Sequence, residues 1–336
     1  MRIASRDRAG LLSLINRFAR QRIVVLGDLV ADEFIHGEIS RVSREAPVLI
    51  LHERRREVVP GGGANAANNL IELGARINLV GALGDDGPGQ ALRRYFTAKG
   101  VSMRRVLTPR GYVTPTKSRV LGGIGHGHLQ QVVRVDREPP WPLHKDVRRK
   151  LSRSVLPLGG RASALLISDY GYGAVNSGEA EFLRRGLGGR LPVTVDSRYH
   201  ILSYTHVTAS TPNEPEVETA LGQRIGDNAA TLHKLAARLL KATKLDALLV
   251  TRGREGMALY EPGRRPVLLP IFGSDQVADV TGAGDTVIAA FTLALAAGAD
   301  FLSAAMIANC AGGLVVMKSG TATVQARELA EAVRNA

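Results

Sequence analysis

Cysteine is scarce in this chain of 336 residues, and long apolar runs are absent. The one cysteine, Cys310, excludes an internal disulfide and suits a reducing compartment, so we expect a cytoplasmic protein. No uninterrupted apolar run reaches the roughly 18 residues of a membrane-spanning helix, which predicts no membrane partner. The N-terminal stretch mixes charges with short apolar steps, so it is typical of an amphipathic first helix and not of a secretory signal.

Aromatic residues are also few, at 4% of the chain, and this bears on the net charge of +13. Such a positive balance is typical of nucleic-acid binding or of a site that collects phosphorylated substrates. The arginines stand in short, scattered clusters, and there are few aromatic rings on which bases could stack. We therefore expect no nucleic-acid partner, and most of these arginines are expected to be solvated surface charge.

Two common nucleotide-binding motifs are missing. No G-x-x-x-x-G-K-[ST] occurs, which excludes a P-loop enzyme as far as a motif can. The segment GAGDTV has Val287 where a dinucleotide fingerprint has its third glycine, and it lies far from the opening strand. A dehydrogenase is therefore excluded on the position of its motif.

The chain does have a regular alternation of apolar strands and helical segments, clearest after about residue 140. This rhythm predicts an α/β fold with a mostly parallel sheet and helices on both faces. Ligands bind beyond the carboxyl ends of such strands, where the sequence places Asp28, Asp169, Asp196, Asn213 and Thr251. Two segments that alternate polar and apolar residues, approximately 33–59 and 112–136, predict exposed antiparallel strands that form a lid.

The segment DVTGAGDTVIAAF, residues 279–291, places Gly282, Ala283 and Gly284 at a helix start directly before Asp285. The first N–H groups of a helix lack internal acceptors, and glycine lets an anion approach them. Asp285 can then accept the proton of an attacking alcohol while these N–H groups stabilise a transferring phosphoryl group. The alternative, in which Asp285 only bonds its own first turn, stays open.

Together with PGGGANAANNLIELGA at 60–75, this segment resembles the two signatures of the ribokinase-like (PfkB) carbohydrate kinases. The resemblance extends from about residue 20 to 333. It implies one ribokinase-like kinase domain over residues 1–336, with a doubly wound, mostly parallel sheet, helices on both faces and a small β-strand lid. It also implies ATP and Mg²⁺ as cofactors and a homodimer formed through the lid strands, whose exposed edges tend to be covered by a neighbour.

Within the family, the sequence is most similar to kinases of D-glycero-D-manno-heptose 7-phosphate, on segments such as GDLVADEFIHGEISRVSREAPV and LISDYGYGAV. That likeness implies transfer of the γ-phosphoryl group to the anomeric hydroxyl. The product is the heptose 1,7-bisphosphate of lipopolysaccharide-precursor synthesis. Many such relatives carry a nucleotidyltransferase domain with an H-x-G-H signature. The HGH at 126–128 has the wrong spacing, so we expect a stand-alone kinase.

The resemblance also assigns roles. Asp285 becomes the general base, and the N–H groups of Gly282, Ala283 and Gly284 become the anion hole. The sugar is expected to contact Asp28, Asp32, Gly61, Gly62, Gly63, Asn65 and Asn68, with a turn role as the alternative for the two aspartates and a helix-facing amide for Asn68. The 7-phosphate is expected to contact Lys117, Arg119 and Arg134, with Arg41 and Arg44 as further candidates.

The nucleotide side follows from TPNEPEVE, where Asn213 and Glu216 match the N-x-x-E element of the family. Glu216 is expected to organise Mg²⁺ through water. Helix capping by Asn213 is the alternative. The nucleotide groove is expected to include Thr251, Gly253, Gly256 and Asn309.

Because the sequence departs from the family pattern in three places, the identity of the acceptor sugar stays open. The chain has Arg44 in SREAP for the usual proline, DSRYH for DPKG around Asp196, and an unusual GIGHGH stretch that contains His126 and His128. A kinase of another sugar or sugar phosphate is the first alternative. A non-catalytic sugar-binding regulator is the second, and the intact Asp285 argues against it.

Overall fold

The main sheet has nine strands, and a computed structural model describes them together with the rest of residues 5–123, 129–189, 191–226, 228–273 and 278–336. Their order is β13 (Val267–Leu269), β12 (Met257–Tyr260), β11 (Ala247–Thr251), β10 (Ala209–Ser210), β9 (Val193–Ser197), β8 (Ala164–Asp169), β1 (Arg22–Gly27), β4 (Arg76–Ala82) and β5 (Val106–Leu107). All neighbours pair in parallel except β11–β12 and β12–β13, which are antiparallel. The predicted mostly parallel sheet is confirmed.

Alternate residues of the central strand enter two separate cores. Ile23 and Val25 pack into one cluster and Val24 and Leu26 into the other, and all four are buried. A strand covered on both faces reads as a continuous apolar run because neither face meets water. The predicted helices on both faces are therefore confirmed.

The first core is lined by helices α1 (Ser5–Asn16), α2 (Gly62–Glu72), α3 (Gly87–Ala98), α8 (Ala283–Ala296), α9 (Phe301–Val315) and α10 (Ala326–Asn335). The second is lined by α4 (Lys145–Val155), α5 (Ser177–Gly186), α6 (Glu214–Leu221) and α7 (Ala229–Thr243). Short 3₁₀ turns complete the chain at η1 (Phe18–Arg20), η2 (Met103–Arg105), η3 (Leu156–Arg161), η4 (Ile201–Ser203) and η5 (Gly253–Glu255). None of the described helices combines the length and the apolarity that crossing a membrane requires.

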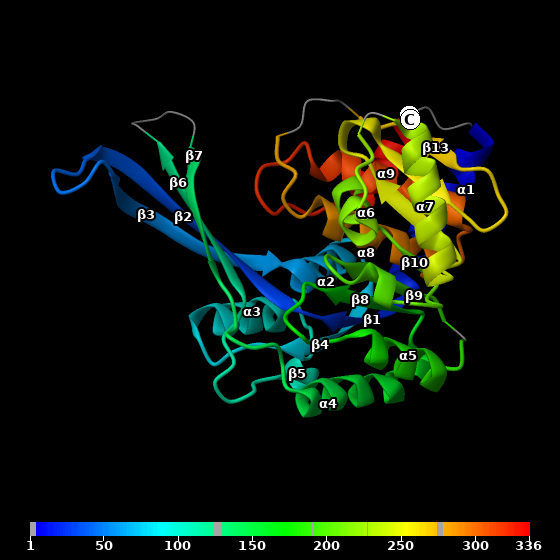
Figure 1. The fold of residues 1–336 in the computed structure, drawn as a ribbon, viewed down its shortest axis with the longest axis horizontal. Coiled ribbons are helices and arrows are strands. Elements are labelled where there is room, and N and C mark those ends of the chain that lie inside the picture. The colour runs from blue at the N-terminus through cyan, green and yellow to red at the C-terminus, as the bar shows by residue number, and fades with distance from the viewer. Residues whose placement is uncertain (1–4, 124–128, 190, 227, 274–277) are drawn as a thin grey trace.

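A second sheet of four strands forms an arm that projects from the body (Figure 1). Its order is β3 (Leu49–Gly61), β2 (Leu29–Val42), β6 (Thr116–Gly123) and β7 (Gln130–Arg137), and we call it the lid. Each hairpin, β2–β3 and β6–β7, is antiparallel as predicted. The two hairpins meet through a parallel pair, β2–β6, because both strands start beside the main sheet, where Ala31 pairs with Thr116, and run outward.

The expected features of the GIGHGH stretch cannot be placed in this architecture. Residues 124–128, which include His126 and His128, lie outside the described residues.

Candidate active site

Asp285 lies in the first turn of α8, at the junction of the main sheet and α2. The helix begins at Ala283, and Gly282 precedes it in the left-handed conformation with φ of 76°. One carboxylate oxygen, Oδ2, accepts a hydrogen bond from Asn65 Nδ2 at 2.9 Å, and Oδ1 accepts one from the Tyr170 hydroxyl at 2.9 Å. The carboxylate therefore faces α2 and the loop after β8, and it does not cap its own helix.

The surroundings of Asp285 place its titration near neutral pH. Its side chain is buried, and this burial raises the pKa of Asp285 to about 7. The bonds from Asn65 and Tyr170 act against that rise, the charge of Asp32 adds to it, and the charge of Lys117 lowers the pKa again. A carboxylate with a pKa near the working pH is suited to general base catalysis.

The glycine-rich start of α8 offers a partly open set of N–H groups. Among the residues that the structure describes, the N–H groups of Gly282 and Gly284 have no acceptor. A Cβ added at Gly284 would meet nothing within 4 Å, so the helix start is open there. The N–H of Ala283, in contrast, donates to the Val280 carbonyl at 3.2 Å. Of the three members of the predicted anion hole, Ala283 is thus the one whose N–H bonds another residue in the described part of the chain.

The glycines where β3 joins α2 allow this junction to pack closely against β2 of the lid. A Cβ added at Gly61 would lie 2.7 Å from Asp32 Oδ2, and Gly62 has a φ of 51°. The Gly63 N–H donates to the Asp28 carbonyl at 3.1 Å. These contacts fix the start of α2 and so place Asn65 beside Asp285. Any contact of these glycines with a sugar stays a prediction.

The carboxylate of Asp28 is hydrogen-bonded by backbone N–H groups of the loop after β8. Its carboxylate accepts backbone N–H bonds from Tyr170 at 2.9 Å, Tyr172 at 3.0 Å and Ala174 at 2.9 Å. Burial raises the pKa of Asp28 to about 6, although these bonds act against the rise. Asp28 therefore has the turn role, in which it holds the loop that carries Tyr170, and a sugar contact of Asp28 stays a prediction.

Of the three cations expected at the acceptor phosphate, two are paired with carboxylates. Arg119 is buried and forms an ion pair with Asp32 at 2.8 Å, and the phosphate contact of Arg119 and the sugar contact of Asp32 stay predictions. Arg134, on β7, bonds Asp136 through Nε at 2.7 Å and Nη2 at 2.5 Å.

Lys117 is the third of these cations, and its charge lowers the pKa of Asp285. Its ammonium nitrogen lies 5.0 Å from the centre of the Tyr170 ring. It has no ion pair with a carboxylate within the described part of the chain. Lys117 is therefore available to an anionic ligand.

Asn68 shows the helix-facing alternative. Its amide oxygen accepts a hydrogen bond from the Tyr95 hydroxyl of α3 at 3.0 Å, and its side chain is buried. It therefore ties α2 to α3, and a sugar contact stays a prediction.

The nucleotide side contains a capping box at the start of α6. Glu216 N–H donates to Asn213 Oδ1 at 2.8 Å, and Asn213 N–H donates to Glu216 Oε2 at 3.0 Å. The capping alternative for Asn213 is therefore present in the structure. Burial raises the pKa of Glu216, and the nearby charge of Glu216 adds to the effect of burial in raising the pKa of Asp196.

The other residues expected in the nucleotide groove hold the loops of that region in place. The Thr251 N–H donates to the Pro212 carbonyl at 2.9 Å, and Asn309 Nδ2 donates to the Pro270 carbonyl at 2.8 Å. Gly253 and Gly256 have φ of 52° and 82°. Contact of these four residues with a nucleotide stays a prediction.

Two residues near Asp285 were missed by the reasoning from sequence. Tyr170 follows β8 directly, but an aromatic residue in a loop gives no signal of the carboxylate that it contacts. Asp279 accepts from the N–H groups of Thr281 at 2.8 Å and Gly320 at 3.0 Å, so it ties the glycine-rich turn to the loop before α10. The repeated aspartate of DVTGAGD was the only available signal.

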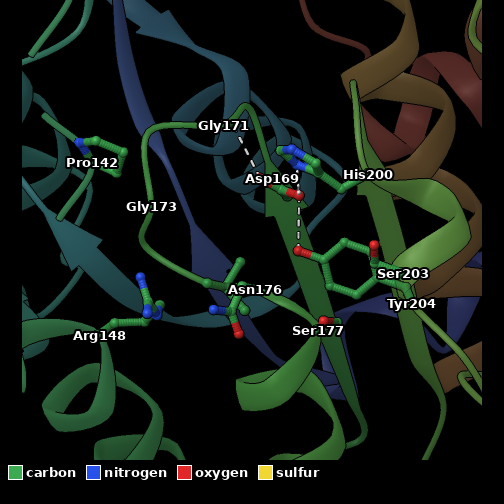
Figure 2. Close-up of a pocket in the computed structure, with 11 residues that line it drawn as sticks. Pro142, Arg148, Asp169, Gly171, Gly173, Asn176, Ser177, His200, Ser203 and Tyr204 are labelled. Atoms are coloured by element: carbon green, nitrogen blue, oxygen red, sulfur yellow. Dashed lines mark hydrogen bonds and ion pairs between the residues drawn. The ribbon is translucent and has the colours of Figure 1, made fainter. Parts of the chain in front are cut away.

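A separate pocket of about 240 Å³ lies beside the loop that follows β8. Its lining includes Asp169, His200, Tyr204 and Asn176 (Figure 2). Asp169 accepts a hydrogen bond from the Tyr204 hydroxyl at 2.8 Å and another from the Ser197 hydroxyl at 2.9 Å. Asp169 therefore stabilises the fold next to the site.

A parallel sheet with a β lid, and a buried carboxylate at a glycine-rich helix start between them, defines the class of ribokinase-like sugar kinases. The fold is similar to that of ribokinase from Arabidopsis thaliana complexed with ribose and ATP (TM-score 0.72, 21% identity, 94% of this chain and 98% of that one). It is also similar to phosphofructokinase-2 from Escherichia coli in complex with substrates and products (TM-score 0.73, 18% identity, 94% and 98%).

The chain belongs to the pfkB family of carbohydrate kinases, which it matches over residues 20–123 and 191–327. It is therefore a carbohydrate kinase.

Curated relatives include bifunctional proteins HldE. The chain is 37% identical to that of Pelobacter propionicus over 329 residues, which is 97% of this chain and 66% of the relative. It is 38% identical to that of Coxiella burnetii over 322 residues, or 95% of this chain and 65% of the relative. The chain thus spans slightly less than two thirds of the length of these relatives.

Proposed function

We propose that this kinase transfers the γ-phosphoryl group of ATP to the anomeric hydroxyl of D-glycero-D-manno-heptose 7-phosphate. The product is the heptose 1,7-bisphosphate, a precursor of ADP-heptose and lipopolysaccharide. The similarity to the HldE proteins supports this substrate within the pfkB family.

The observation that carries the acceptor class is a group of cations beside the base. Burial lowers the pKa of Lys117, the negative charge of Asp32 acts against this, and the positive charges of Arg198 and of Arg134, which is itself paired with Asp136, lower it further. Arg198 follows β9 in DSRYH, and it supplies a positive charge where the family has the lysine of DPKG. A region with several cations close together favours a ligand with a phosphate group of its own.

In the proposed reaction, Asp285 accepts the proton of the anomeric hydroxyl. The freed oxygen attacks the γ-phosphorus, an O–P bond forms, and the bond to the β-phosphate oxygen breaks so that ADP leaves. The N–H groups of Gly282 and Gly284 at the start of α8 stabilise the charge on the phosphoryl oxygens. Asn65 and Tyr170 hold the carboxylate, and the lid covers the acceptor and excludes water.

Magnesium fits the nucleotide side as a water- and phosphate-coordinated ion. The described residues contain no cluster of three or more metal-ligating side chains, so a fully protein-bound metal is not supported. Glu216 and Asp196, however, are two carboxylates whose pKa values are raised by burial, and a cation between them would relieve their repulsion. When bound, Mg²⁺ would neutralise charge on the nucleotide phosphates.

The first test is ADP release from Mg-ATP with a panel of acceptors. The panel contains the heptose 7-phosphate, the same heptose without phosphate, fructose 6-phosphate, fructose 1-phosphate and ribose. We expect turnover on the heptose 7-phosphate and a loss of about 10²–10⁴-fold in Asp285→Asn, the range for removal of a general base. Asp300→Asn is the matched control, because Asp300 caps α9 and Asn caps a helix equally well.

The outcomes separate the substrate from the chemistry. Turnover on another acceptor, lost in Asp285→Asn, would reject the heptose and keep the mechanism. Equal rates with and without the 7-phosphate would reject the role of the cations. Turnover that survives in Asp285→Asn would reject the base.

We also propose that the protein is a homodimer formed through the lid. The outer strand β7 is exposed along its whole length, and its Val133 and Val135 are 47% and 56% exposed. A long edge strand with apolar side chains is a site where another chain pairs.

A further inference from the structure

The loop between β8 and α5 carries a side chain that acts directly on the proposed base. Tyr170 is the first residue after β8, and its hydroxyl donates to Asp285 Oδ1 at 2.9 Å. The other oxygen of Asp285 is held by Asn65 from α2, at 2.9 Å. Each carboxylate oxygen can accept two bonds, so one lone pair on each remains for an acceptor hydroxyl. Asp285 is thus fixed from two sides before a substrate arrives.

The position of Tyr170 is set by contacts on every side. Its backbone N–H donates to the buried carboxylate of Asp28, which also binds two further N–H groups of the same loop. A Cβ added at Gly62 would lie 3.2 Å from Tyr170 Cε2, so the ring packs closely against the start of α2. The ammonium group of Lys117 covers the ring from the lid, 5.0 Å from its centre. The hydroxyl therefore cannot turn away from Asp285 without moving the loop, α2 or the lid.

We propose that Tyr170 is a positioning residue that keeps Asp285 oriented and ionised for proton abstraction. The proposal rests on the role of Asp285 as the base in the proposed function. The phenol donates only to the carboxylate and so favours its charged form. Asp28 holds the loop after β8 in place, and this loop in turn holds Tyr170 against Asp285. Tyr170 does not contact the reacting atoms, so its effect is on the protonation and geometry of Asp285.

The other charged groups that face Asp285 come from different elements. Asp32 of β2 raises the pKa of Asp285, and Lys117 of β6 lowers it. Asp196 of β9 interacts with the same carboxylate, since the charge of Asp285 contributes to its raised pKa. These groups stay in place in a Tyr170→Phe variant, which removes one oxygen and keeps the ring beneath Lys117. Any change in the titration of Asp285 can then be assigned to the lost bond.

The expected effect is a rise of the Asp285 pKa by about one to two pH units, the size expected for a lost hydrogen bond to a charged group. A base works only when it is deprotonated. The acid limb of kcat/KM should therefore move to higher pH by the same amount. Tyr170→Phe should be about 5–50-fold slower than the wild type at pH 7 and should recover about half or more of its rate at pH 9.

The test measures this titration directly, so that it does not depend on the acceptor. Protein labelled with ¹³C at the aspartate carboxyls is titrated by NMR, and the Asp285 signal is the one that is lost in Asp285→Asn. Tyr172→Phe is the matched control, because Tyr172 lies in the same loop and its hydroxyl donates to Glu138 instead, at 2.9 Å. We expect the Asp285 titration to shift in Tyr170→Phe and to stay unchanged in Tyr172→Phe.

An unchanged Asp285 titration in folded Tyr170→Phe would overturn the proposal, even if activity falls. If that variant does not fold, a fluorinated tyrosine at position 170 keeps the shape and makes the phenol a stronger donor. It should lower the Asp285 pKa, and no shift there would also overturn the proposal. Inactivity of the wild type on every acceptor would reject the proposed function, while the NMR result would still decide the role of Tyr170.

Discussion

Gly282 and Gly284 flank the same alanine, but the structure gives them different tasks. Gly282 has a φ of 76°, and a Cβ there would lie 2.5 Å from Asn65 Nδ2. Gly284 is helical and exposed, and a Cβ there meets no protein atom within 4 Å. The first glycine is therefore required by the fold, and the second leaves space for whatever binds at the helix start.

The two alanine variants should separate stability from activity. Gly282→Ala should lower the free energy of unfolding by about 1–3 kcal/mol, because of backbone strain and displacement of Asn65. Gly284→Ala should leave that energy unchanged or raise it by up to about 1 kcal/mol, since alanine favours a helix. Its kcat/KM for ATP should fall by about tenfold or more, the effect of losing about 1.4 kcal/mol of binding. Urea unfolding and steady-state kinetics measure both, and an active Gly284→Ala would contradict the anion site.

The raised pKa of Asp285 also makes a prediction about stability. A group whose pKa rises on folding stabilises the folded state below its unfolded pKa, and that contribution is lost as the pH rises through the folded value. For Asp285 this window extends from about pH 4 to about pH 7. Asp285→Asn should therefore be more stable than the wild type at pH 8, by about 2 kcal/mol after allowing for the poorer fit of an amide between two donors.

Urea unfolding of both proteins at several pH values measures this difference. It should shrink as the pH falls towards 4. Asp28, whose pKa is raised to about 6, titrates in both proteins and cancels in the comparison. A difference in stability that does not depend on pH would show that the pKa of Asp285 is not raised in the folded protein.

At the scale of elements, the start of α6 combines a capping box with the proposed magnesium site. Gln can replace Glu at the third position of a capping box, because its amide oxygen still accepts the bond from Asn213 N–H. Glu216→Gln should therefore change the free energy of unfolding by less than about 0.5 kcal/mol. The Mg²⁺ concentration for half-maximal activity should rise several-fold, because one carboxylate charge is lost.

A matched variant separates the two roles of this element. Asn213→Ala removes the cap and should cost about 1 kcal/mol of stability. Activity titrated against Mg²⁺, together with urea unfolding, distinguishes the two variants. If Glu216→Gln keeps the magnesium dependence of the wild type, Glu216 acts only as part of the cap.

Elements whose signal is local could be predicted from the sequence. The buried run before Asp28 and the glycine turn before Asp285 each carry their structure in adjacent residues, and both the sheet and the start of α8 agree with the prediction. The parallel pairing of β2 with β6 could not be predicted, because alternation within a strand does not identify its neighbour.

The same limit applies to the candidate site. Asp285 could be recognised because glycines precede it. Its partners Asn65 and Tyr170 come from segments 220 and 115 residues away, and no pattern in their own neighbourhoods points to it. Arg119 has the residue type of a phosphate ligand, but its pairing with buried Asp32 depends on the register of β2 and β6. Residue type predicts the chemistry that is possible, and tertiary contacts decide which group remains available.

At the scale of the whole molecule, the lid is a sheet whose outer strand β7 is exposed in a single chain. The body buries both faces of its sheet, whereas the lid projects away from it and ends in the exposed strand β7 (Figure 1). Val133 and Val135 are two residues apart and so lie on one face of that strand. If a second chain covers them, the dimer also holds in place the sheet that carries Lys117.

A charge at these two positions should therefore separate the subunits. We expect the wild type to have twice the chain mass of 35.9 kDa by light scattering and Val133→Glu/Val135→Glu to have the single mass. Leu268→Glu is the matched control, because Leu268 is 51% exposed on β13, the edge strand of the other sheet. The urea midpoint for unfolding of the main domain should stay the same in the separated variant. Its affinity for the acceptor should fall, because Lys117 lies on the lid strand β6 and the lid is no longer held by a partner. A monomeric wild type would contradict the proposed dimer. A dimer that persists in the double variant would show that the subunits meet at another surface.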